Sequence, residues 1–282
     1  MTSTRLIVGW AAVLGTLPYL ALKAAWLAGS TVGVLDVPAF ADPSVTALNA
    51  ITAAMDLVAI VVALAFTYPW GQRVPALLVL VPIWVGTGFL APIVFLLPMT
   101  GLSLGAAPAD PVLASWVQPV VYTGFGWQGL MLMIAFVLYA RVRWPWVFRV
   151  DRVGVRVLPV VLGDLGAALG AVAGVLLLWG GSAADVVQGL MAVLAAGGVV
   201  VLVHGVRCRF WAPVVVTWLG AGSMFSWGMW GLLNNLTGTA LSNGEVPPVT
   251  VAAAAAGLLI GLGSLLSLSG SGTGRAGRTA PS

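Results

Sequence analysis

The chain has 282 residues, of which 60% are hydrophobic and only 7% are charged. In ordinary soluble domains about a quarter of the residues are charged, so this composition excludes a soluble globular protein of this size. The net charge of +4 does not indicate a nucleic-acid partner, because the basic residues lie in short loops between apolar segments and form no basic stripe or arm. The single cysteine, Cys208, excludes an internal disulfide and a metal site built from cysteines.

The apolar segments predict a membrane protein made of helices. A helix needs about 20 apolar residues to cross a hydrocarbon core of roughly 30 Å, and lipid offers the backbone no hydrogen-bond partners. The expected spans are residues 6–28, 45–66, 75–97, 116–140, 157–179, 186–203, 212–233 and 249–268. We therefore expect an all-α polytopic transmembrane bundle of about eight spans. Residues 1–268 would form a single transmembrane helical domain, and residues 269–282, rich in Gly and Ser, a disordered cytoplasmic tail.

The distribution of charge predicts that both termini are cytoplasmic. With this orientation, eleven of the twelve Lys and Arg residues lie in or beside inner loops, and the outer loops carry acidic residues without basic ones. This is the asymmetry expected of a multi-pass protein in the cell membrane. The outer acidic residues are Asp36, Asp42, Asp110, Asp185 and Glu245.

Asp56 is a carboxylate in the middle of the second expected span. Asn49, Thr52 and Asp56 are spaced i, i+3 and i+7, which places them on one helical face. At about 1.5 Å per residue Asp56 lies roughly 15 Å from the outer end of the span. An ionisable group at such a depth indicates a functional site. Burial favours a neutral carboxyl group, so Asp56 can serve as a Brønsted acid. An ion pair with Lys23, in the first span, is an equally open interpretation.

Other polar and aromatic residues lie at comparable depths in the later spans. Gln128 in the fourth span needs a hydrogen-bond partner near mid-membrane, so we expect it to face the same interior as Asp56. Gly beside aromatic residues favours either a cavity with aromatic walls or close helix packing. The aromatic candidates are Trp84, Trp127, Phe225 and Trp227.

Several spans contain prolines, which bend helices and free backbone carbonyls. Pro18, Pro82, Pro92 and Pro119 lie inside expected spans. Broken helices beside a buried acid are typical of transporters that hold a coupling ion.

Two further ionisable residues favour structural interpretations. Asp164 lies among Gly163, Gly166 and Gly170 in the fifth span, which indicates close helix packing with a bonded carboxylate. His204, the single histidine, is expected to be solvated at an inner helix end.

Familiar cofactor motifs are missing from the sequence. The chain has no GxxxxGK[ST] loop, no HExxH helix and no paired aspartates of the kind that hold magnesium diphosphate. We therefore expect no cofactor and no metal.

Three stretches carry a resemblance to known proteins. They are GTLPYLALKAAWLAG, AAMDLVAIVVALAFTYPWGQRVPALLVLVPIWVGTGFLAPIV and GFGWQGLMLMIAFVLYARVRW. Over roughly its first half the chain resembles a family of polytopic actinobacterial membrane proteins. More loosely, it is similar to the bacterial integral-membrane terpene cyclases, which are isomerases of terpenoid biosynthesis.

The second resemblance implies proton-initiated cyclisation of a prenyl chain, such as the farnesyl group of a prenylated indole. Asp56 would then protonate a terminal alkene, and the four aromatic candidates would stabilise the cation. Asn49, Thr52 or Gln128 would orient the carboxyl proton. Two alternatives remain open: a proton-coupled small-molecule transporter or permease that uses Asp56 and Lys23, and a non-catalytic accessory protein of the membrane.

Overall fold

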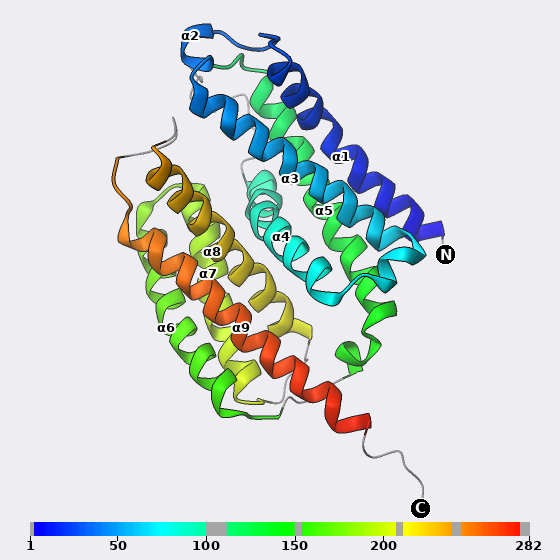
Figure 1. Cartoon of the computed structure of the whole chain (residues 1–282). Helices are drawn as coiled ribbons and strands as arrows, with labels where there is room; N and C mark the ends of the chain where they lie inside the picture. The colour runs from blue at the N-terminus through cyan, green and yellow to red at the C-terminus, as the bar shows by residue number, and fades with distance from the viewer. Residues whose placement is uncertain (1–2, 100–111, 150–153, 207–210, 239–243, 277–282) are drawn as a thin grey trace, which may run out of the picture. The chain divides into compact units, whose positions relative to one another are not determined.

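The computed structural model describes residues 3–99, 112–149, 154–206, 211–238 and 244–276 (Figure 1). Cys208 and Asp110 lie outside these residues. The helices, in chain order, are α1 (Ser3–Leu27), α2 (Val37–Phe40), α3 (Pro43–Thr67), α4 (Ala76–Met99), α5 (Val117–Arg143), α6 (Val157–Gly180), α7 (Ala183–Val203), α8 (Trp211–Thr237) and α9 (Pro248–Ala276). Two short 3-10 helices, η1 (Pro69–Arg73) and η3 (Pro145–Arg149), follow α3 and α5.

The expectation of an all-α polytopic bundle is confirmed. Among the described residues, seven helices are long and apolar enough to cross a membrane, namely α1, α3, α4, α5, α6, α7 and α9. The seventh expected span, residues 212–233, corresponds to α8, which has 27 residues but is not among these seven helices. Its buried face carries four polar side chains, those of Thr217, Ser223, Ser226 and Asn234. The chain is therefore a multi-pass membrane protein.

Local sequence signals account for several helix ends. Asp42 caps α3 by accepting a hydrogen bond from the Ser44 backbone N–H at 2.7 Å, and Pro43 occupies the first helical position. Ser182 caps α7 in the same way through the Asp185 N–H. Gly181 ends α6 with φ of 78°, a left-handed conformation that favours glycine.

The helices group into two compact units. Unit 1 comprises Met1–Tyr139 and Leu233–Glu245, and unit 2 comprises Ala140–Leu232 and Val246–Ser282. The predicted single domain thus contains two clusters of contacts. The tail was expected to begin at residue 269, whereas α9 continues as a helix to Ala276.

Aromatic packing at the predicted cytoplasmic end stabilises unit 1. The Tyr139 ring centroid lies 4.9 Å from that of Phe66, and the Tyr139 hydroxyl donates a hydrogen bond to the Gly71 carbonyl at 2.8 Å. Both aromatic side chains are fully buried. Tyr139 therefore ties α5 to α3 and to η1.

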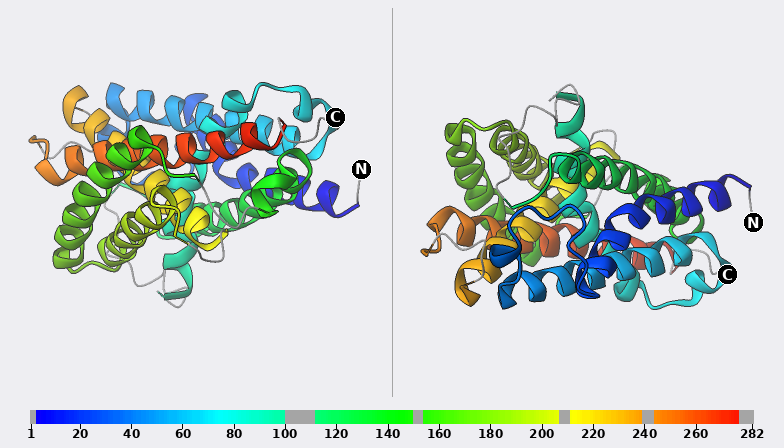
Figure 2. Two further views of the ribbon diagram at one scale, coloured as in Figure 1. Left: turned by 90° about the horizontal axis from the view of Figure 1, so that it is seen from below. Right: turned by 90° about the horizontal axis from the view of Figure 1, so that it is seen from above.

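Unit 2 relies on close approach of helix backbones. α6 and α7 lie side by side in both views of Figure 2, and α6 also packs along α9. A Cβ added to Gly166 would lie 2.8 Å from the Ile260 backbone N, and one added to Gly263 would lie 3.0 Å from the Gly163 N. Glycines at these positions let the backbones approach closely, as is typical of membrane helices.

Candidate functional site

The candidate site lies in unit 1, where α3 presents a polar face to α1 and α5. Asn49 and Asp56 are each 6% exposed, and Thr52 between them is half-buried. The Thr52 hydroxyl donates a hydrogen bond to the Leu48 carbonyl of its own helix at 2.8 Å and also interacts with the Tyr19 side chain. The helical spacing thus turns all three residues inward.

Lys23 is buried at the outer end of this face. Its ammonium donates a hydrogen bond to Asn49 Oδ1 at 2.6 Å. The same nitrogen lies 4.6 Å from the centroid of the Tyr19 ring and 5.1 Å from that of the Trp26 ring. Cation–π attraction and the amide oxygen therefore stabilise its charge.

Lys23 and Asp56 do not form an ion pair. Both are among the described residues, and no Lys23 nitrogen lies within 4.0 Å of an Asp56 oxygen. The two side chains are still close enough to attract each other electrostatically. Seven residues separate Asn49 from Asp56, about 10 Å along the helix, and Lys23 bonds to the nearer amide. The interpretation of a direct ion pair is therefore wrong.

Asp56 instead contacts Gln128 of α5. Gln128 is 2% exposed, and its Nε2 donates a hydrogen bond to Asp56 Oδ1 at 3.4 Å. Within the part of the chain that the structure describes, no group donates to Asp56 Oδ2 or to Gln128 Oε1. The pair therefore contains two buried acceptors without a donor between them.

One proton on Asp56 would satisfy both acceptors. A neutral carboxyl group has an O–H donor, and with a primary amide it can form two antiparallel hydrogen bonds. A carboxylate has only acceptors, so the amide oxygen facing it stays unpaired, and an unpaired buried polar atom is costly. The geometry of the pair is thus suited to gaining and losing a proton.

Close helix packing positions Gln128. A Cβ on Gly15 of α1 would lie 2.9 Å from the Gln128 backbone N, and one on Gly124 would lie 3.2 Å from the Gly15 carbonyl oxygen. On the other side of α5, a Cβ on Gly129 would lie 2.9 Å from Leu90 Cβ. Close contacts on both sides therefore fix α5 relative to α1 and to α4.

An apolar cavity of about 260 Å³ begins one helical turn from the Asp56–Gln128 pair. Ala59 follows Asp56 by three residues and Leu132 follows Gln128 by four, so both lie on the same helical faces as the pair. The remaining lining residues are Met55, Val58 and Val62 of α3 and Pro82, Ile83, Val85 and Gly86 of α4. The walls are aliphatic and contain no aromatic ring.

The aromatic candidates do not gather around Asp56 within unit 1. The Trp127 indole is half-exposed, and its N–H donates to the Ala11 carbonyl of α1 at 2.8 Å. Trp84 is half-buried on α4 and does not line the cavity. Phe225 and Trp227 belong to α8 in unit 2, where Trp227 lines a separate pocket.

The sequence did not reveal two features of the polar residues. Tyr19 and Trp26 stack on Lys23, and their spacing of four and three residues from it could have predicted that contact. His204 Nε2 lies 3.1 Å from Asp164 Oδ1, and both side chains are almost half-exposed. Asp164 thus has a bonded partner, but the partner is the His204 side chain and not the hydroxyl or backbone group that close packing suggests, while His204 is exposed as expected.

The fold and the site together define a multi-pass helical membrane protein with a buried carboxyl–amide pair. A comparison of the chain with protein-family models, with curated proteins and with solved structures finds no match in any of the three.

Proposed function

We propose that the chain is a proton-coupled transporter of a small molecule, in which Asp56 carries the proton. The observation behind this proposal is the Asp56–Gln128 pair with its two unmatched acceptors. Protonation adds a second hydrogen bond to the pair and deprotonation removes it, so the proton changes the contact between α3 and α5. Proton binding can therefore be coupled to a helix movement.

The surrounding helices favour such a movement. Pro18 lies inside α1, and Pro82 and Pro92 lie inside α4. Each proline removes a backbone hydrogen bond and allows its helix to bend. Both helices are continuous, so their prolines are points where the helices can bend, and not the breaks that hold coupling ions in many secondary transporters.

Lys23 would contribute by attraction rather than by direct bonding. Its charge is stabilised by Asn49 and two aromatic rings whether or not Asp56 is ionised. Loss of the Asp56 proton creates a negative charge that Lys23 attracts from its place near the outer end of α1. Lys23 thereby stabilises the ionised form of Asp56 without forming a direct ion pair, which would hold Asp56 in the ionised form.

The second candidate is proton-initiated cyclisation of a prenyl chain attached to an acceptor such as an indole. The aliphatic cavity next to Asp56 favours it, because apolar walls can accommodate an isoprenoid chain. The cavity offers no aromatic face for the carbocation, and for this reason we rank transport first.

The test is the substitution Asp56→Asn in the purified chain reconstituted into liposomes. Asparagine keeps the shape and can still bond to Gln128, but it cannot carry a proton. Uptake from a mixture of labelled metabolites is measured by mass spectrometry with and without an inward proton gradient. We expect gradient-dependent uptake to fall to the level of empty liposomes.

Asp164→Asn is the matched control, because it removes the other carboxylate within a predicted span. It should keep most of the gradient-dependent uptake. In parallel, both variants and the parent chain are incubated with a farnesylated indole, and the products are analysed. Cyclised product that depends on Asp56 would favour the second candidate, and unchanged uptake by Asp56→Asn would refute the proposed role of this residue.

A further inference from the structure

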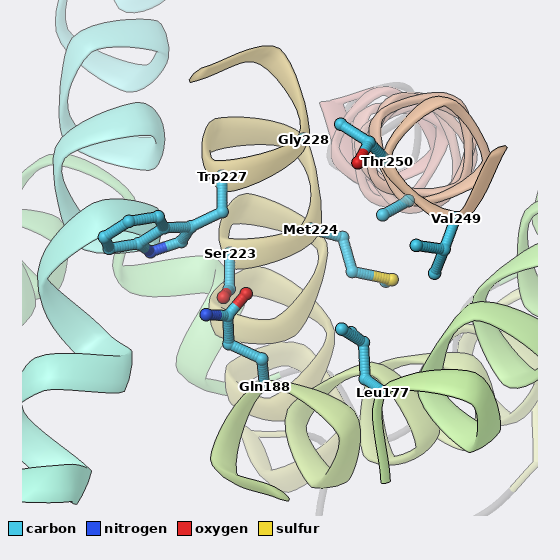
Figure 3. A pocket seen from close by; sticks show the side chains of 9 residues that line it. Leu177, Gln188, Ser223, Met224, Trp227, Gly228, Val249 and Thr250 are labelled. Atoms are coloured by element: carbon cyan, nitrogen blue, oxygen red, sulfur yellow. The ribbon is translucent and has the colours of Figure 1, made fainter. Parts of the chain in front are cut away.

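Unit 2 contains a pocket of its own, about 90 Å³ in volume (Figure 3). Four helices line it, with Leu177 of α6, Gln188 of α7, four residues of α8 and three of α9, namely Ser223, Met224, Trp227, Gly228, Val249, Thr250 and Ala253. Leu177 lies near the end of α6, Gln188 near the start of α7 and Val249 at the start of α9. In the predicted topology these are the outer ends of the helices.

Three polar side chains face this pocket without a partner in the protein. They belong to Gln188, Ser223 and Thr250, and among the described residues none of the three takes part in a hydrogen bond. Ser223 is 2% exposed and borders the pocket, so a ligand inside the pocket can reach its hydroxyl. Figure 3 shows the Ser223 hydroxyl and the Gln188 amide on the same side of the pocket.

The rest of the lining restricts the chemistry of a ligand. No charged side chain borders the pocket, so an ion would lose its hydration without compensation. Leu177, Met224 and Val249 provide an apolar wall. One water molecule occupies about 10–15 Å³ of pocket volume. A pocket of about 90 Å³ therefore has room for a solute of a few non-hydrogen atoms.

We propose that this pocket binds a small neutral amide, with its polar end at Gln188 and Ser223 and its alkyl end against Leu177 and Met224. A primary amide has both a donor and an acceptor, and it can pair with the Gln188 carboxamide through two hydrogen bonds. The Ser223 hydroxyl can accept or donate a further bond. This site is independent of Asp56 and of the proposed transport, since all its residues belong to unit 2.

The test uses acetamide and propionamide as probes with the full chain in lipid nanodiscs. Binding is measured by ligand-observed NMR titration, and acetate serves as the charged control of the same size. We expect saturable binding of both amides and none of acetate. Removing one hydrogen bond by Ser223→Ala should weaken binding by about threefold to tenfold, and Gln188→Leu should weaken it more.

Ser226→Ala is the matched control, because Ser226 lies on the same helix but does not line the pocket. It should leave the dissociation constant unchanged. Far-UV circular dichroism and a thermal melt report folding, and Gln188→Leu, at a half-exposed position, carries the test if Ser223→Ala does not fold. Absence of saturable amide binding, equal binding of acetate, or undiminished binding by Gln188→Leu would each overturn the proposal.

Discussion

Replacing Gly166 with alanine should loosen the packing of α6 on α9. The added methyl group would lie 2.8 Å from both the Ile260 backbone N and Ile260 Cγ1, and 3.0 Å from Leu259 Cβ. Ordinary contacts between such atoms are about 3.5–4.0 Å, so α9 has to move away by about 0.7 Å or more. The side chain of Ile260 can rotate, but its backbone nitrogen cannot move without the helix.

Two opposing effects determine how much Gly166→Ala changes the free energy of unfolding. Overpacking of this kind costs typically about 1–3 kcal/mol, while alanine in a helix gains about 0.5–1 kcal/mol over glycine. We therefore expect Gly166→Ala to lower the free energy of unfolding by about 1–2 kcal/mol. At Gly197 of α7 an added Cβ meets nothing within 4 Å, so Gly197→Ala should raise that free energy by about 0.5–1 kcal/mol.

The assay is reversible unfolding of the purified chain in mixed micelles with increasing SDS, followed by circular dichroism. Both variants make the same chemical change in the same unit, so their difference isolates the contact with α9. Equal stability of the two variants would refute the close backbone approach of α6 and α9. Destabilisation by Gly197→Ala alone would refute it as well.

Three further predictions concern unit 1. Gly15→Ala should push the Gln128 backbone away from α1 and reduce Asp56-dependent activity at normal expression; unchanged activity would contradict this positioning role. Tyr139→Phe removes a buried hydroxyl that donates to η1 and should cost about 0.5–1.5 kcal/mol in the same SDS titration. Hydrogen bonds from the Ser44 side chain and backbone lower the pKa of Asp42. A lowered folded-state pKa gives stability above the ordinary Asp value of about 3.9, and this stability is lost as pH falls through the lowered value. The protection of the first turn of α3 against hydrogen exchange, taken relative to the intrinsic exchange rate at each pH, should therefore fall in acid. Asp42→Asn should abolish that acid-dependent change in exchange.

The helical spans could be predicted because their signals are local. Apolar length and the side on which Lys and Arg lie depend on the sequence of each segment alone. α8 is the exception, because it has the length of a span but is not among the seven helices that are both long and apolar enough, and four polar residues lie on its buried face. At about 1.5 Å per residue, its 27 residues still reach about 40 Å, enough to cross a bilayer.

The partners within the site could be predicted only in part. The helical spacing of 3.6 residues per turn places Asn49 and Asp56 on one face of α3. Either side chain could bond to Lys23. Which of the two does so depends on how far α1 is shifted along α3, and the sequence does not fix that shift. Trp127 and Gln128 are neighbours along α5 and point about 100° apart, so they could not both face Asp56. The structure turns Gln128 to Asp56 and Trp127 to Ala11.

The depth of Asp56 also makes it sensitive to the membrane potential. Asp56 lies near the middle of α3, so a proton that reaches it from either side crosses roughly half of the electric field. Moving one charge across the whole membrane changes the free energy by about 2.3 kcal/mol per 100 mV. Half of this free energy, about 1.15 kcal/mol per 100 mV, corresponds to about a sevenfold change in the ratio of protonated to ionised Asp56. An energised cell would therefore set the proton occupancy of Asp56 by voltage as well as by pH.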